Sequence, residues 1–222
     1  MFHRHARLLA ALAAAVVVTA AAIAVSASGG SSRQQTPSAP VSTLFSGIPE
    51  HDGVLGDPNA PVTLTEYVDL QCPICAEASK QTLPWLVQKY VRTGKAKLDL
   101  RALHFIGPDS QKAARVAAGA EAQGRLWPFV EAFYANQGQE NSGYVTDDFL
   151  RSVSKAAGVD AGKALAAADG EPAQRFLEQA NADATRLGVD STPTFTVAKG
   201  DAQPKVIGSG VLPTSAFTKA IG

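Results

Sequence analysis

The sequence has few of the residues that bind metals. Its 222 residues include two cysteines, one methionine and four histidines. A zinc site built on a Cys-x-x-Cys pair needs two further ligands. The chain has no third cysteine, and His3 and His5 lie apart from the other two histidines, His51 and His104. We therefore expect no metal and no other cofactor.

The sequence also lacks an excess of charge of either sign. Its 20 Lys and Arg residues balance 20 Asp and Glu residues, without a basic cluster. Without Arg4 and Arg7, 18 basic residues stand against 20 acidic ones, a net charge of −2. Such a chain offers no positive face for nucleic acid. It contains no internal repeat, and about 180 residues beyond the N-terminal segment suffice for one core but not for two domains.

The first 28 residues are typical of an export signal or membrane anchor. A basic start is followed by Leu8–Val25, which contains no charge and one polar residue, Thr19. Val25-Ser26-Ala27 would suit signal cleavage, whereas eighteen apolar residues approach the length that spans a bilayer. Residues 29–47 are predicted to be a flexible linker. Both alternatives place the rest of the chain on the extracytoplasmic side, where a dithiol can be oxidised.

Both cysteines lie in Gln71-Cys72-Pro73-Ile74-Cys75, directly after the apolar run 62–68. Pro73 is suited to the first turn of a helix. At a helix start, unpaired N–H groups and the positive end of the helix dipole favour the thiolate of Cys72. A purely structural disulfide is disfavoured, because so short a loop gains little closure entropy. The motif therefore indicates thiol–disulfide exchange.

Hydrophobic patterning predicts the order of helices and strands along the rest of the chain. The first part reads as a strand over 62–68, a helix from 73 to about 92 with a kink near Pro84, and a strand over 97–103. Four helices follow, over 112–136, 147–157, 161–168 and 172–187, with Thr146 and Asp160 as N-caps and Gly188 as the terminator. Strands over 194–198 and 205–207 and a helix over 213–221 complete the order.

This order, βαβ, a helical block and then ββα, predicts an α/β thioredoxin fold with an inserted all-helical subdomain at about 109–170. Motifs along the chain make the likeness more specific: Gly56–Pro61 with 62–67, Cys72–Cys75, Leu126–Phe129, Tyr134–Gln137 and Ser191–Phe195. Over residues 48–222 the chain resembles the DsbA-like thiol–disulfide oxidoreductases, in particular the membrane-tethered or exported bacterial branch that includes BdbD-type proteins. It departs from the strongest oxidants in having Pro-Ile between its cysteines.

The candidate site residues are Cys72, Cys75, Glu66, Thr192 and Pro193. Cys72 is the expected nucleophile and Cys75 the resolving thiol. The side chain between them, Ile74, supplies no charge or donor, which predicts a weaker oxidant than those with histidine there. We expect His104 to be structural. The aromatic residues 127, 129, 133 and 134 form either the core of the insertion or a peptide groove.

Glu66 lies in a strand that is otherwise largely apolar. It is either a carboxylate on a solvated face or a buried acid that exchanges protons with Cys75, and the resemblance implies the second. The resemblance also implies a cis Thr192–Pro193 bond beside Cys72, in a loop that pairs with substrate peptides. The alternative is a trans proline at the start of a strand.

The resemblance implies disulfide formation in exported polypeptides, with re-oxidation by a membrane quinone-linked partner of the DsbB or VKOR kind. A disulfide reductase or isomerase on the same fold remains an alternative. A chaperone or binding module without enzymatic activity is a third. We expect a monomer.

Overall fold

The structure, a computed structural model, describes residues 43–222. The predicted export segment, residues 1–28, and the linker up to residue 42 lie outside the described residues. The described residues fall within one compact unit.

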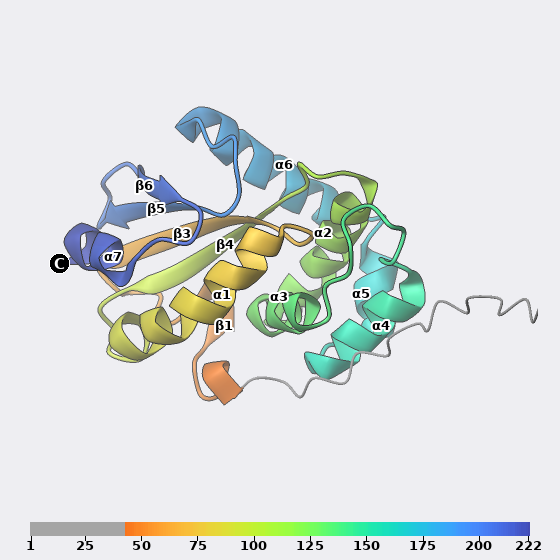
Figure 1. The fold of residues 1–222 in the computed structure, drawn as a ribbon. Helices are drawn as coiled ribbons and strands as arrows, with labels where there is room; N and C mark the ends of the chain where they lie inside the picture. Colours follow the sequence, from red (N-terminus) through yellow and green to blue (C-terminus); the bar gives the residue numbers. More distant parts are fainter. Residues whose placement is uncertain (1–42) are drawn as a thin grey trace, which may run out of the picture. The chain divides into compact units, whose positions relative to one another are not determined.

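A mixed six-stranded sheet forms the centre of the fold, in the order β1-β2-β4-β3-β5-β6 (Figure 1). The central strand β3 pairs parallel with β4 and antiparallel with β5. Its burial follows from its position between two neighbouring strands, which pair with its backbone groups, and from helices that cover both of its faces. The strands are β1 (Glu50–His51), β2 (Val54–Leu55), β3 (Val62–Asp69), β4 (Lys97–Leu103), β5 (Thr194–Lys199) and β6 (Lys205–Ser209).

Helices cover both faces of the sheet. The larger core contains residues of α1, α3 and α7 packed with Leu64 and Val68 of β3. A smaller core joins Tyr67 of β3 to Ala180 and Ala184 of α6. Alternate residues of β3 therefore face opposite helical layers. The helices are α1 (Pro73–Leu86), the π-helical turn η2 (Val87–Val91), α2 (Pro108–Glu121), α3 (Leu126–Ala135), α4 (Asp147–Ala156), α5 (Ala161–Ala167), α6 (Glu171–Leu187) and α7 (Thr214–Ile221), and a short 3₁₀ turn η1 covers Thr43–Phe45.

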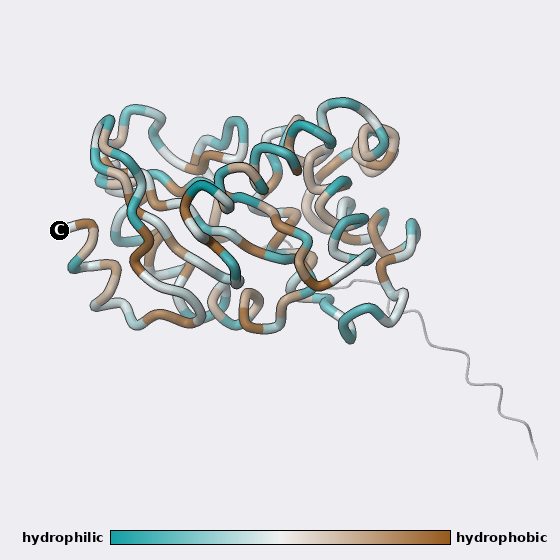
Figure 2. Tube along the Cα trace, turned by 90° about the horizontal axis from the view of Figure 1, so that it is seen from above, coloured by the Kyte–Doolittle hydropathy of each residue, from teal (hydrophilic) through white to brown (hydrophobic). Residues whose placement is uncertain are grey.

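The thioredoxin fold with a helical insertion is confirmed. Four helices, α2 to α5, lie between β4 and α6, close to the range of about 109–170 predicted for the insertion. Along the helices in Figure 2, hydrophobic and hydrophilic residues alternate, as expected where one side of each helix faces a core. Thr146 and Asp160 cap α4 and α5, and Gly188 ends α6 in a left-handed conformation (φ 69°), as predicted.

Two details of the prediction were wrong. The single helix predicted over 112–136 is two helices, because Gly124 takes a positive φ of 63° between them. The second helix begins at Leu126, with Pro128 in its first turn, where the missing N–H is not needed. The hairpin of β1 and β2 was missed, since two residues per strand show no alternation. The first helix contains Pro84 and continues as a π-helical turn at 87–91, close to its predicted end at about residue 92.

Candidate active site at the start of α1

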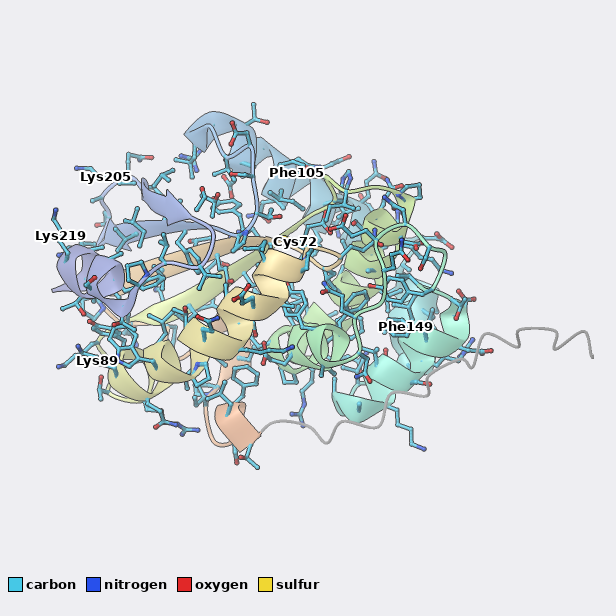
Figure 3. All side chains as sticks on the ribbon, in the orientation of Figure 1. Cys72, Lys89, Phe105, Phe149, Lys205 and Lys219 are labelled. Carbon is cyan, nitrogen blue, oxygen red and sulfur yellow. The ribbon has the colours of Figure 1, made fainter. Side chains whose placement is uncertain are left out.

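Cys72 is the N-cap of α1, where β3 leads into the helix (Figure 3). Its Sγ accepts a hydrogen bond from the backbone N–H of Cys75 (3.4 Å), and its thiol form donates to the Thr192 carbonyl (3.4 Å). The Thr192–Pro193 bond is cis, as predicted. The structure thus brings four of the five predicted site residues together, although they come from segments about 120 positions apart.

The two free thiols differ in exposure and in acidity. Cys72 is 6% exposed and Cys75 is fully buried. A hydrogen bond from the Cys75 side chain, with further bonds from the Thr192 side chain and the backbone N–H groups of Cys75 and Ile74, lowers the pKa of Cys72 to about 6 despite partial burial. Burial, followed by the proximity of Cys72, raises the pKa of Cys75 well above its ordinary value. At neutral pH the reduced site therefore holds a thiolate at Cys72 and a thiol at Cys75.

Glu66 is buried in β3. Its position places its side chain on the same face as Leu64 and Val68, beneath α1. It forms no salt bridge with any residue of 43–222. Burial and then repulsion from Glu131 raise its pKa to about 8. The alternative of a carboxylate on a solvated strand face is therefore wrong.

Sequence reasoning missed Glu131, which lies on α3 and accepts a hydrogen bond from Ser79 Oγ of α1. It was detectable, because it is the one charged side chain within the helix 126–135, where most residues are apolar. It also missed the polar role of Tyr134, whose hydroxyl donates to the Asp69 carbonyl (3.4 Å). Burial, followed by the negative charges of Cys75 and Glu66, raises the pKa of Tyr134 well above its ordinary value.

A polar network fixes the loop between β3 and α1. The buried Asp69 carboxylate accepts hydrogen bonds from Ser110 Oγ (2.6 Å) and from the backbone N–H groups of Gln71 (2.9 Å) and Ile106 (3.0 Å). The Gln137 amide donates to the carbonyls of Leu70 (2.7 Å) and Cys72 (3.2 Å). Residues of the helical insertion thus hold the backbone that carries Cys72.

The surface around Cys72 is partly apolar. Ile74 is 43% exposed, and Phe105, in the segment after β4 (Figure 3), is 48% exposed. A hydrogen bond from the Ile106 backbone N–H to the Asp69 carboxylate holds this segment beside the loop before Cys72. The aromatic cluster at residues 127, 129, 133 and 134 is buried, which agrees with its interpretation as core and leaves it no role as an open groove.

The site combines a buried dithiol at a helix start with a cis-proline loop that faces it, on a thioredoxin fold. These features are those of thioredoxin-fold proteins with a Cys-x-x-Cys site. Comparison with known proteins agrees. A protein-family model described as thioredoxin matches residues 49–204. The chain belongs to this thioredoxin family.

Particular relatives are disulfide bond formation proteins. The probable disulfide bond formation protein D of Bacillus cereus is 33% identical over 103 residues, 46% of this chain and 48% of that protein. The chain thus spans about half the length of that relative. Disulfide bond formation protein D of Bacillus subtilis is 26% identical over 159 residues, 68% of this chain and 71% of that protein.

The fold comparison extends over more of the chain. The crystal structure of oxidised BdbD from Bacillus subtilis matches with a TM-score of 0.67 at 22% identity, covering 83% of this chain and 95% of that one. The predicted resemblance to DsbA-like and BdbD-type proteins is confirmed in fold and in relatives.

Proposed function

We propose that the chain is a thiol–disulfide oxidoreductase that introduces disulfides into exported polypeptides through Cys72 and Cys75. The observation that carries the proposal is the difference in acidity between the two thiols, with the pKa of Cys72 lowered to about 6 and that of Cys75 raised. A low thiol pKa stabilises the reduced site and so makes the oxidised form an oxidant.

The exchange proceeds in two displacements. A substrate thiolate attacks Cys72 Sγ of the Cys72–Cys75 disulfide, a substrate–Cys72 bond forms, and the electron pair of the broken bond passes to Cys75. Cys75 takes up a proton, for which the Glu66 carboxyl is the proposed donor. A second substrate thiolate then attacks the substrate sulfur of the mixed disulfide, and Cys72 leaves as a thiolate. The substrate gains a disulfide, and the protein keeps two electrons.

Thr192 and Pro193 are proposed to bind the substrate backbone. The Thr192 carbonyl lies at hydrogen-bonding distance from Cys72 Sγ, and Pro193 leads into β5. An extended peptide beside this loop would place its cysteine over Cys72 and its neighbouring side chains against the exposed Ile74 and Phe105. Such apolar contacts suit unfolded chains, in which apolar side chains are exposed.

The proposed location is the extracytoplasmic face of the cell membrane, with residues 1–28 as anchor or as a cleaved signal. Within residues 43–222, no helix is both long and apolar enough to cross a membrane. A membrane quinone-linked partner of the DsbB or VKOR kind is the proposed oxidant that restores the disulfide. We further propose that the chain acts as a monomer in which 48–222 form the thioredoxin domain.

The reduction potential of the Cys72–Cys75 couple tests the proposal. Equilibration of the full-length chain with glutathione buffers should give a potential well above that of thioredoxin, about −270 mV. The oxidised chain should also form disulfides in a reduced, unfolded test protein, and Cys72→Ala should abolish this activity. A potential near or below that of thioredoxin would instead support the reductase alternative. Retained activity in Cys72→Ala would remove the assignment of the nucleophile.

A further inference from the structure

A second, half-buried acid lies against the helix that carries the dithiol, on a different element from Glu66. Glu131 belongs to α3, where its neighbours, among them Trp127, Phe129 and Val130, are apolar and buried. A carboxylate in such surroundings is costly unless a partner stabilises it. Its position within an apolar helix therefore needs an explanation beyond packing.

The partner of Glu131 comes from the dithiol helix. Ser79, buried on α1, donates a hydrogen bond from Oγ to Glu131 Oε1. It follows Cys75 by four residues, so both side chains lie on the same face of α1, one turn apart. This bond fixes the Glu131 carboxylate under the helix that carries the resolving thiol. Glu66 faces the same interior from β3, close enough for the two acids to repel each other.

We propose that Glu131, held by Ser79, is a positioning residue that keeps the proton on Glu66 at neutral pH, ready for transfer to Cys75. This inference rests on the proposed function. Two neighbouring carboxyl groups do not both ionise readily, and the one that is less buried and has the better partners ionises first. Burial raises the pKa of Glu131, but the Ser79 hydroxyl and then the charge of Lys80 act to lower it, whereas Glu66 forms no salt bridge within 43–222.

A proton held on Glu66 is available to Cys75 in the step that opens the disulfide. When the substrate–Cys72 bond forms and the Cys72–Cys75 bond breaks, the electron pair on Cys75 Sγ takes the proton from the Glu66 carboxyl. The new Glu66 carboxylate then faces Glu131 and is raised in free energy, so it regains a proton from solvent and the site is reset. Other ionisable groups near Glu66 are the two cysteines, Asp69 at the end of β3, and Tyr134 of α3, which stays protonated.

The test measures how fast glutathione opens the disulfide of the oxidised full-length chain as pH varies. Rates are obtained by quenched flow with acid trapping and are divided by the glutathione thiolate fraction. In the wild type the corrected rate should fall with a midpoint near pH 8, where Glu66 loses its proton. In Glu131→Gln this midpoint should move down by about one pH unit, which reduces the rate by about twofold at pH 7 and about fivefold at pH 8.

Two variants control the measurement. Glu66→Gln should remove the pH-dependent limb. Glu77→Gln removes the same charge from an exposed position of α1 and should leave the midpoint unchanged. Ser79→Ala removes the hydrogen bond that stabilises the Glu131 carboxylate, so it should shift the midpoint in the same direction as Glu131→Gln by a smaller amount. If Glu131→Gln does not fold, Ser79→Ala provides the test.

The result that overturns the inference is distinct from failure of the proposed function. The role of Glu131 is refuted if the midpoint in both Glu131→Gln and Ser79→Ala equals the wild-type value. It is also refuted if the pH-dependent limb persists in Glu66→Gln. In either case disulfide exchange itself still stands. A wild-type chain whose disulfide does not react with glutathione would instead refute the proposed function.

Discussion

Replacing Glu66 by glutamine should stabilise the protein in a strongly pH-dependent manner. Glutamine keeps the size of the side chain and resembles the protonated acid, so it removes only the cost of burying a charge. The pKa of Glu66 is about 8 in the folded chain, against an ordinary value of 4.5. This difference corresponds to about 5 kcal/mol of free energy of unfolding when the group is ionised in both states.

The pH window follows from the direction of this pKa change. Because the folded-state pKa is raised, the wild type has its full stability below about pH 4.5 and loses it as pH rises through 8. Glu66→Gln should therefore match the wild type near pH 4, exceed it by about 3 kcal/mol at pH 7, and by about 5 kcal/mol above pH 8.

Urea denaturation of both reduced proteins between pH 4 and pH 9 measures this difference. Other titrating groups, Cys72 included, contribute to both proteins and largely cancel in the subtraction. Glu77→Gln, at an exposed position of the adjacent helix, should give a difference near zero at every pH. A stability difference for Glu66→Gln that does not change with pH would refute the reasoning, because it would mean that the Glu66 carboxylate is hydrated in the folded chain.

Two further predictions concern the thiols and the loop before them. Alkylation of the reduced chain by iodoacetamide should label Cys72 with a midpoint near pH 6 and leave Cys75 unmodified, and earlier labelling of Cys75 would contradict the assignment. Gln137→Leu leaves the Leu70 and Cys72 carbonyls without their amide donor and should cost about 1–3 kcal/mol in urea denaturation. The exposed Gln139→Leu should cost far less, and equal losses would exclude the loop contact as the cause.

Local signals in the sequence were sufficient to predict the frame of the site. Pro73 and the apolar run before Cys72 predicted a strand, a helix start and a thiol at its cap, and the structure has all three. The cap at Thr146 and the terminator at Gly188 were similarly local. Each of these features depends on neighbours within about four residues, the range in which backbone geometry is dictated by side-chain type.

Contacts between distant segments could not be predicted in this way. Ser79 and Glu131 are 52 positions apart, and Ser110 reaches Asp69 across 41. No periodicity connects such positions, because packing of α1, α2 and α3 around the end of β3 brings them together. The break at Gly124 was missed for a related reason, since the surrounding residues favour helix on both sides.

Ile74 shows how the two kinds of information combine. From the sequence, the lack of a charge or donor in its side chain predicted weaker stabilisation of the thiolate. In the structure its backbone N–H nevertheless contributes to lowering the pKa of Cys72, together with Cys75 and Thr192. These donors come from the helix start and the cis-proline loop, whatever side chain occupies the dipeptide. The dipeptide can therefore adjust the oxidising strength. The order of the pKa values follows from the fold: the pKa of Cys72 is the lowest, that of Glu66 is higher, and that of Cys75 is the highest. That order places the thiolate at Cys72 and a proton on Glu66 at neutral pH, which is the arrangement that the proposed opening of the disulfide uses.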